Sequence, residues 1–165
     1  MCQEQETRFW EDLKSGKFAS MVGESVKAQS LSNASEVYNI VKPLFAEQDD
    51  VEVFYGIFLD AANRILAIEK LSTGTLSSSP IYPREIVKKV LAYKSSAIVF
   101  AHNHPSGKTD PSREDHAITI KLGIALDSIG VTIHDHIIVG DGYHSMADAG
   151  WLATMRQKIA DLTIP

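Results

Sequence analysis

Two histidines flank one asparagine in the segment HNHPSGKTDPSRED, and both could bind a metal. In an extended chain alternate side chains point the same way, so His102 and His104 face one side and Asn103 faces the other. Ser112 and Asp115 follow one helical turn apart, so their side chains can face the same space. Two imidazole nitrogens and one carboxylate oxygen would leave one position of a tetrahedral zinc ion open, which is typical of a catalytic site.

A helix start explains part of this pattern without any metal. Ser112 followed three residues later by Asp115 is similar to a capping box, in which the serine accepts a backbone hydrogen bond and the acid suits the helix dipole. Helix caps are far commoner than metal ligands, and an isolated His-x-His pair on a strand is a moderate signal. However, the two pairs converge on one loop, and the cap is compatible with a second role for Ser112.

Hydrolysis at such a site needs a base that removes a proton from water without binding the metal. Glu52 is the candidate, because this acid opens a predicted strand (51–60) where few charges belong unless they are exposed or functional. A solvent-facing glutamate at the end of a strand is the alternative, and the local sequence alone favours it.

The rest of the chain alternates between helical and extended patterns, which indicates an α/β layered domain with a mixed sheet. The strand at 96–101 is nearly all apolar, so we expect it to be central and buried on both faces. Residues 141–145 are expected to form a turn. The sequence predicts helices over 32–45, 83–93, 112–130 and 151–162, and strands over 51–60, 65–72, 96–101 and 131–140. The third of these helices should bury a stripe made of Ile118, Leu122, Ala125, Leu126 and Ile129.

Length and composition place the chain among ordinary globular domains. Its 165 residues suit one domain over 33–165, preceded by a polar, loosely attached N-terminal extension over 1–32 with a short helix around Phe9–Leu13. The formal net charge of −5 argues against a protein built to grip nucleic acid. No apolar run is long enough to span a membrane, and Cys2 is the single cysteine, so a reducing cytoplasm is the expected compartment.

His134 and His136 form a second His-x-His pair on the strand predicted over 131–140. A second metal is one interpretation, but we favour a strand that supports the first site from one face, through hydrogen bonds to a metal ligand. Arg84 begins a helix, where its charge does not suit the helix dipole. It either binds a carboxylate or stays solvated, and the sequence leaves both open.

The spacing as a whole resembles a known family signature. His-Asn-His, seven residues, Ser, two residues and Asp, with an upstream Glu that opens a strand, is similar to the JAMM signature of the JAB/MPN metalloprotease domain. Further short motifs resemble the RadC-like branch of that family, and the resemblance covers roughly residues 33–153. These motifs are GT (74–75), PRE (83–85), HNHPSG (102–107), PSRED (111–115), DHIIVG (135–140), Ser145 and Gly150.

The resemblance implies a cytidine-deaminase-like fold, in which a mixed β-sheet is sandwiched by helices. It implies that His102, His104 and Asp115 bind one Zn²⁺ per chain. Glu52 would then act as general acid/base on water, and Ser112 would donate a hydrogen bond to the oxyanion of the tetrahedral intermediate.

The implied function is that of a zinc-dependent metallohydrolase, a peptidase or isopeptidase whose peptide or protein substrate the sequence does not identify. Two alternatives stay open: a DNA-repair-associated RadC-like factor whose zinc site is a scaffold, and a metal-free interaction module. Longer RadC proteins carry an N-terminal helix-hairpin-helix segment, whose pattern the first 30 residues lack. Exposed edge strands could pair between subunits, which would give a homo-oligomer.

Overall fold

The computed structural model describes residues 3–46 and 50–163, in which five strands form one sheet in the order β2-β1-β3-β4-β5. The strands β3 and β4 are parallel neighbours, and the other neighbouring pairs are antiparallel. The sheet is therefore mixed, as the sequence predicted. The strands are β1 (Val53–Leu59), β2 (Ile65–Thr73), β3 (Ala97–Asn103), β4 (Thr132–Gly140) and β5 (Gly142–Ser145).

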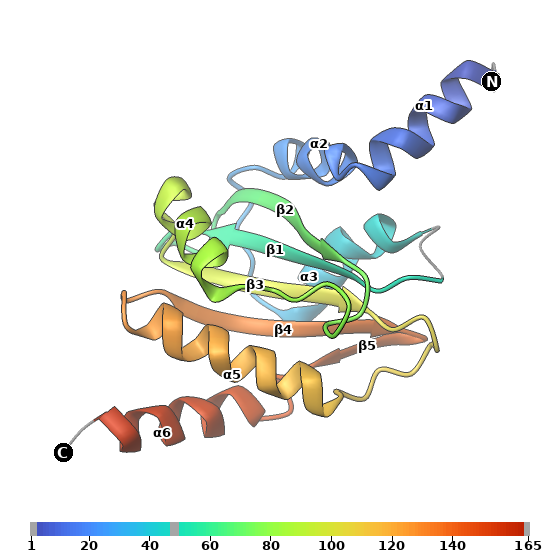
Figure 1. Cartoon of the computed structure of the whole chain (residues 1–165). Coiled ribbons are helices and arrows are strands. Elements are labelled where there is room, and N and C mark those ends of the chain that lie inside the picture. The colour runs from blue at the N-terminus through green and yellow to red at the C-terminus, as the bar shows by residue number, and fades with distance from the viewer. Residues whose placement is uncertain (1–2, 47–49, 164–165) are drawn as a thin grey trace.

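Helices cover both faces of this sheet (Figure 1). The helices α2 and α3 and the short turn η1 pack on one face, and α4, α5 and α6 pack on the other. The mixed α/β sandwich is confirmed, and within the described ranges no helix is long and apolar enough to cross a membrane. The helices are α1 (Gln3–Lys14), α2 (Lys17–Ser25), α3 (Ala34–Val41), η1 (Lys42–Phe45), α4 (Pro83–Tyr93), α5 (Arg113–Asp127) and α6 (Trp151–Thr163).

The central strand β3 is buried along its whole length, as its apolar sequence predicted. Its alternate side chains enter two separate apolar clusters, with Val99 facing α3 and Phe100 facing α5. The strand runs two residues further than predicted. His102 and Asn103 are thus paired within the sheet rather than placed after it, and the backbone ladder fixes the direction of each side chain.

The pairing of β3 with β4 contains an irregularity that matters for the site. Ile98 lies opposite Ile133, but the next residue, Val99, lies opposite Asp135, so His134 is an extra residue in β4. Such a bulge is uncommon in a parallel pair, and it changes which side chains of the bulged strand face each side.

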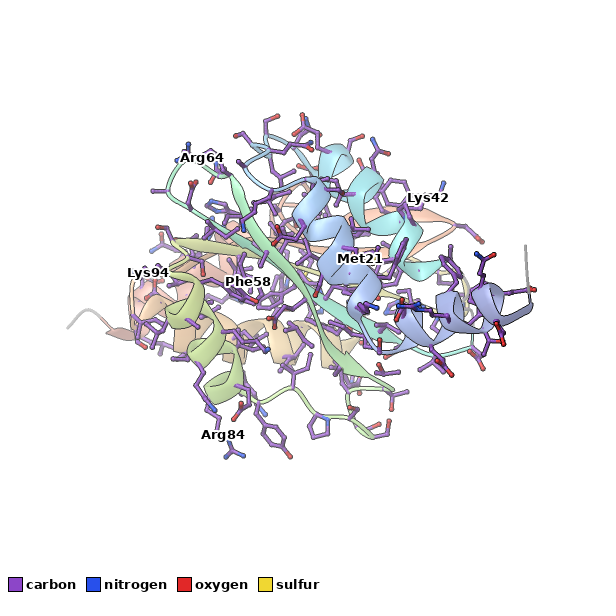
Figure 2. The ribbon with its side chains drawn as sticks, turned by 90° about the horizontal axis from the view of Figure 1, so that it is seen from above. Met21, Lys42, Phe58, Arg64, Arg84 and Lys94 are labelled. Carbon is purple, nitrogen blue, oxygen red and sulfur yellow. The ribbon has the colours of Figure 1, made fainter. Side chains whose placement is uncertain are left out.

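The N-terminal segment was predicted to be loosely attached, and this is wrong for α2. This helix lies across the sheet, with Met21 on its outer side (Figure 2). Ala19 on its inner side is 1% exposed, and Gly23 is so close to β2 that an added Cβ would lie 3.0 Å from the backbone nitrogen of Ile68. Its inner face therefore completes the core on that side of the sheet.

Two smaller predictions are also wrong. Residues 142–145 form β5 and not a turn, because Gly142 takes a positive φ of 97° and folds the chain back along β4 at once. Ile129 was assigned to the buried stripe of the long helix. That helix ends at Asp127, two residues before Ile129, and the side chain is 41% exposed.

Candidate metal centre

The three side chains predicted to bind a metal converge. The Nε2 atoms of His102 and His104 lie 3.0 Å apart. The Asp115 carboxylate faces both, with Oδ1 3.0 Å from Nε2 of His102 and Oδ2 3.1 Å from Nε2 of His104. In a tetrahedral zinc site ligand atoms are about 3.3 Å apart, because zinc lies about 2.0–2.2 Å from nitrogen and oxygen. These residues therefore form a group that could hold one metal ion.

The strand β3 and the turn after it hold the two histidines. His102 lies opposite Phe54 of β1, is 2% exposed, and has the Phe54 ring stacked on it at 5.4 Å with the planes 8° apart. His104 leaves the strand, but its N–H still donates to the Val139 carbonyl over 2.8 Å. Its Nδ1 lies 3.0 Å from the carbonyl oxygen of Lys108. Strand pairing, the Phe54 ring and the Lys108 carbonyl thus hold both imidazoles in place.

At the metal group two hydrogen-bond acceptors, Nε2 of His104 and Oδ2 of Asp115, face each other with no hydrogen of their own between them. The Lys108 carbonyl can only accept, so Nδ1 of His104 donates to it, and Nε2 of the neutral ring carries a lone pair. That lone pair faces a carboxylate oxygen of Asp115, which also only accepts. Either a proton from solvent or a metal cation has to lie between them. The arrangement fits a zinc ion bound by two nitrogens and one oxygen.

The electrostatics agree with this geometry. Burial opposes ionisation of Asp115, yet hydrogen bonds from His102 and His104, which form when solvent protons occupy their Nε2 atoms, outweigh burial and hold the pKa of the carboxyl well below its usual range. The hydrogen bond to Asp115 raises the pKa of His104 despite burial, with a small contribution from the charge of Glu52. The site therefore holds a fixed negative charge that attracts either protons or a metal cation.

Ser112 caps the helix α5, as predicted. Its Oγ accepts from the N–H of Asp115 over 3.0 Å, and its own N–H donates to Oδ2 of Asp115 over 2.8 Å. This capping box also orients the carboxylate that faces the two histidines, so the cap and the metal group share one structure. The cap uses a lone pair of the hydroxyl and leaves its hydrogen available to an acceptor in front of it.

Glu52 comes directly before β1, and its main chain is held from two sides. The Asn103 side chain bridges the residues that flank it: Val53 N–H donates to Oδ1 over 2.7 Å, and Nδ2 donates to the Val51 carbonyl over 3.0 Å. The N–H of Gly74 donates to the Glu52 carbonyl over 2.8 Å. This role of Asn103 was not predicted from the sequence, although the alternation of side chains places Asn103 opposite the histidines.

An open cleft of ≈ 450 Å³ joins these groups. Glu52, His104, Ser112 and Asp115 line it, and His102 lies behind them. The structure thus brings all five predicted site residues together, while their chemical roles stay predictions. The remaining lining comes from the connection between β2 and α4, the turn after β3 and the start of α5, namely Thr75, Leu76, Ser77, Pro105, Ser106 and Glu114.

Comparison with known proteins places this site in a family. A family model described as "RadC-like JAB domain" matches residues 31–151. The chain belongs to the RadC-like JAB domain family. It carries that family's domain with a His/His/Asp group able to hold a metal.

Relatives with the printed name "UPF0758 protein" support the assignment without naming an activity. The one from Cellvibrio japonicus is 48% identical over 102 residues, which cover 61% of this chain and 46% of the relative. The one from Legionella pneumophila is 39% identical over 128 residues, which cover 76% of this chain and 56% of the relative. The chain therefore spans about half the length of the curated relatives it matches.

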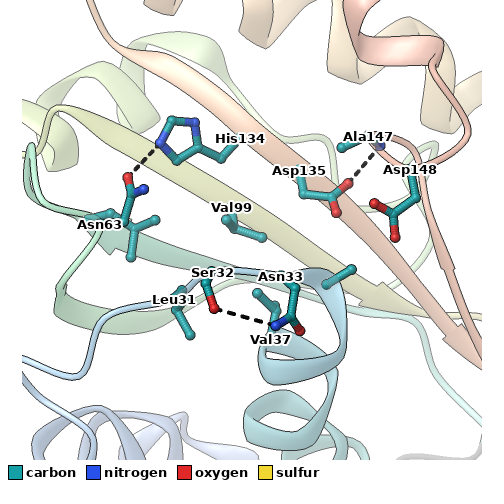
Figure 3. A pocket seen from close by; sticks show the side chains of 12 residues that line it. Leu31, Ser32, Asn33, Val37, Asn63, Val99, His134, Asp135, Ala147 and Asp148 are labelled. Atoms are coloured by element: carbon teal, nitrogen blue, oxygen red, sulfur yellow. Dashed lines mark hydrogen bonds between the residues drawn. The ribbon is translucent and has the colours of Figure 1, made fainter.

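The second histidine pair of this RadC-like domain is split between the two faces of the sheet. Nε2 of His136 lies 2.8 Å from Nδ1 of His102, which agrees with the prediction that this strand supports a metal ligand. His134 points to the other face and bonds Oδ1 of Asn63 over 2.8 Å (Figure 3). There it lines a cavity of ≈ 250 Å³ beside α3, together with the buried Asp135.

Arg84 lies outside the cleft, and Thr119 lies behind the metal group. Arg84 lies at the start of α4 (Figure 2), and its side chain is 76% exposed. It contacts the carboxylate of Glu85 at 3.7 Å and the ring of Tyr82, and it does not line the cleft. Thr119 was missed, although it lies one helical turn after Asp115 and bonds His136. That i, i+4 spacing was the available signal.

Proposed function

We propose that the chain is a zinc-dependent metallohydrolase that cleaves amide bonds, as a peptidase or an isopeptidase. The convergence of His102, His104 and Asp115 at the wall of an open cleft carries this proposal. Zinc is favoured over magnesium or calcium, because two of the three ligands are imidazole nitrogens and the other two metals prefer oxygen.

The chemistry divides among the residues of the cleft. A bound zinc ion would supply Lewis-acid activation of water and of the scissile carbonyl. Glu52, held by its neighbours beside the metal group, would take a proton from the attacking water and deliver it to the leaving amine. The Ser112 hydroxyl, whose hydrogen the helix cap does not use, would donate to the developing oxyanion.

The proposed substrate is a peptide or a protein. The cleft is open to solvent, and it is lined by residues from the segments before β1, between β2 and α4, and between β3 and α5, so an extended chain could lie across it. We propose the cytoplasm as the compartment, because the chain contains one cysteine and no pair that could form a disulfide.

A cleavage screen with a matched variant tests this function. Zinc-loaded protein is mixed with peptides from a proteolysed cell extract and with isopeptide-linked model peptides. Mass spectrometry then detects the new amino termini of cleaved peptides and the freed lysine ε-amines of cleaved isopeptides. Glu52→Gln should keep zinc and lower the cleavage rate by about 10²- to 10⁴-fold, because it removes the general base.

Glu85→Gln, an exposed change on α4, is the control and should keep the full rate. Cleavage at equal rates by Glu52→Gln and the unmodified protein would contradict the assigned base. No cleavage of either substrate class by zinc-loaded protein would instead favour the scaffold alternative.

A further inference from the structure

Behind the metal group runs a chain of hydrogen bonds that begins and ends on its ligands. Nδ1 of His102 lies 2.8 Å from Nε2 of His136, and Nδ1 of His136 lies 2.7 Å from Oγ1 of Thr119. Oγ1 of Thr119 lies 2.6 Å from the backbone carbonyl oxygen of Asp115. His136 and Thr119 are both 0% exposed, so water does not replace these partners.

The acceptor at the end of this chain, the backbone carbonyl oxygen of Asp115, fixes the direction of every hydrogen bond in it. A carbonyl oxygen can only accept, so the single hydroxyl hydrogen of Thr119 goes to Asp115. The hydroxyl must then accept from His136, which places a hydrogen on Nδ1 of that ring. His136 is buried, and neither of its ring nitrogens bonds a carboxylate, so the ring is neutral. Its single ring hydrogen is on Nδ1, and Nε2 is therefore unprotonated.

The unprotonated Nε2 of His136 can only accept a hydrogen bond, so Nδ1 of His102 must carry the hydrogen. Nε2 of His102 is then unprotonated and carries a lone pair, which faces Asp115 and His104. The opposite tautomer of His102 would set two lone pairs against each other at 2.8 Å and would point a hydrogen at the metal position.

We propose that Thr119 and His136 are positioning residues that hold His102 in its Nδ1–H tautomer, ready to bind a metal through Nε2. This inference rests on the metal site proposed above. It assigns a use to two buried polar residues that do not line the cleft.

The fold places His136 for this task through the bulge in β4. Residues 133 and 134 face opposite sides, and the extra residue shifts the alternation, so that His136 lies opposite Phe100 and faces the same side as His102. The ring of Phe54 packs against both imidazoles, at 5.4 Å from His102 and 5.1 Å from His136. These contacts keep the two rings in register for the hydrogen bond.

Thr119→Val tests the proposal with little change in shape, because it replaces the hydroxyl by a methyl group. Without its acceptor, Nδ1–H of His136 is unpaired, and the ring can change tautomer and donate to His102 instead. Zinc affinity, measured by competition with a chromophoric chelator, should fall about 10- to 100-fold, as is usual when a partner of a metal-bound histidine is lost. Thr119→Ser restores the hydroxyl and should restore the affinity.

The tautomers themselves give a second readout that a general loss of stability would not move. Long-range ¹H–¹⁵N spectra of the imidazole nitrogens should show His136 protonated on Nδ1 in the zinc-loaded protein, and a changed pattern in Thr119→Val. Ile118→Val, a small change on the same helix, should leave spectra and affinity as they were.

The outcomes separate this inference from the proposed function. A hydrogen on Nε2 of His136 in the unmodified protein would overturn the inference, as would equal zinc affinity in Thr119→Val and Thr119→Ser. Failure of the unmodified protein to bind zinc would overturn the metal site itself.

Discussion

Two His-x-His pairs belong to neighbouring parallel strands of this domain, one at the end of β3 and the other within β4, and their side chains are directed differently. His102 and His104 bring their Nε2 atoms within 3.0 Å of each other. His134 and His136 are turned to opposite faces of the sheet, one toward Asn63 and the other toward His102. The bulge in β4 causes the difference, because an extra residue breaks the alternation that keeps residues i and i+2 on one side.

In this domain the His-x-His pattern places both side chains on one side of the sheet only where the pairing of the strand contains no bulge. In β3 the ladder with β1 is unbroken from residue 97 to 102, so the alternation read from the sequence holds. In β4 the side chains of residues 134 and 136 do not follow this alternation. His136 supports the metal group, and His134 lines a separate cavity on the other face.

Removing one histidine from each pair should give the largest contrast. His104→Ala should lower zinc affinity by more than about 100-fold, because loss of a ligand exceeds the loss caused by a partner of a ligand. His134→Ala should leave zinc affinity unchanged, since its ring bonds Asn63 on the other face. Chelator competition measures both, and equal losses in the two variants would show that both pairs contribute to the metal group.

Asn103, which lies between His102 and His104, should contribute more to the stability of the fold than to metal binding. Asn103→Ala leaves the N–H of Val53 and the carbonyl of Val51 without this partner, so the free energy of unfolding should fall by about 1–3 kcal/mol. Zinc affinity should change little, because Asn103 faces away from the ligands. Urea unfolding measures the first effect.

Asn39→Ala, on the exposed surface of α3, is the control for Asn103→Ala and should stay within about 0.5 kcal/mol of the unmodified protein. If Asn103→Ala abolished zinc binding while the protein stayed folded, Asn103 would belong to the metal group, and the division between the two faces would be wrong.

The smallest effect is expected on the far face of β4. His134→Ala should cost about 0.5–1.5 kcal/mol of stability through loss of its hydrogen bond to Asn63. Asn63→Ala should remove the same bond, so the double variant should lose less than the sum of the two single variants. Additive losses in urea unfolding would show that the bond contributes nothing.

Much of the site could be predicted from the sequence because it depends on short spacings. His102 and His104 are two apart on a strand, and Ser112 and Asp115 are three apart at a helix start, so local geometry alone aims each pair. Glu52 required the family signature, because one acid before a strand has no local mark of function.

The rest depends on contacts between distant segments, which leave little trace in local sequence. Nothing in the residues around His134 marks an extra residue in the ladder, because the bulge is a property of the pairing with β3. The packing of α2 on β2 relies on small residues such as Ala19 and Gly23, which read as weak helix signals. The role of Asn103 appears only when β1 lies beside β3.

Zinc titration of chelator-stripped protein, followed by calorimetry, tests the central claim most directly. The convergence of His102, His104 and Asp115 predicts one tight equivalent of Zn²⁺ per chain. No uptake of zinc by a protein whose circular dichroism shows the native fold would contradict the account, and the segment from His102 to Asp115 would then be only a strand end and a capped helix.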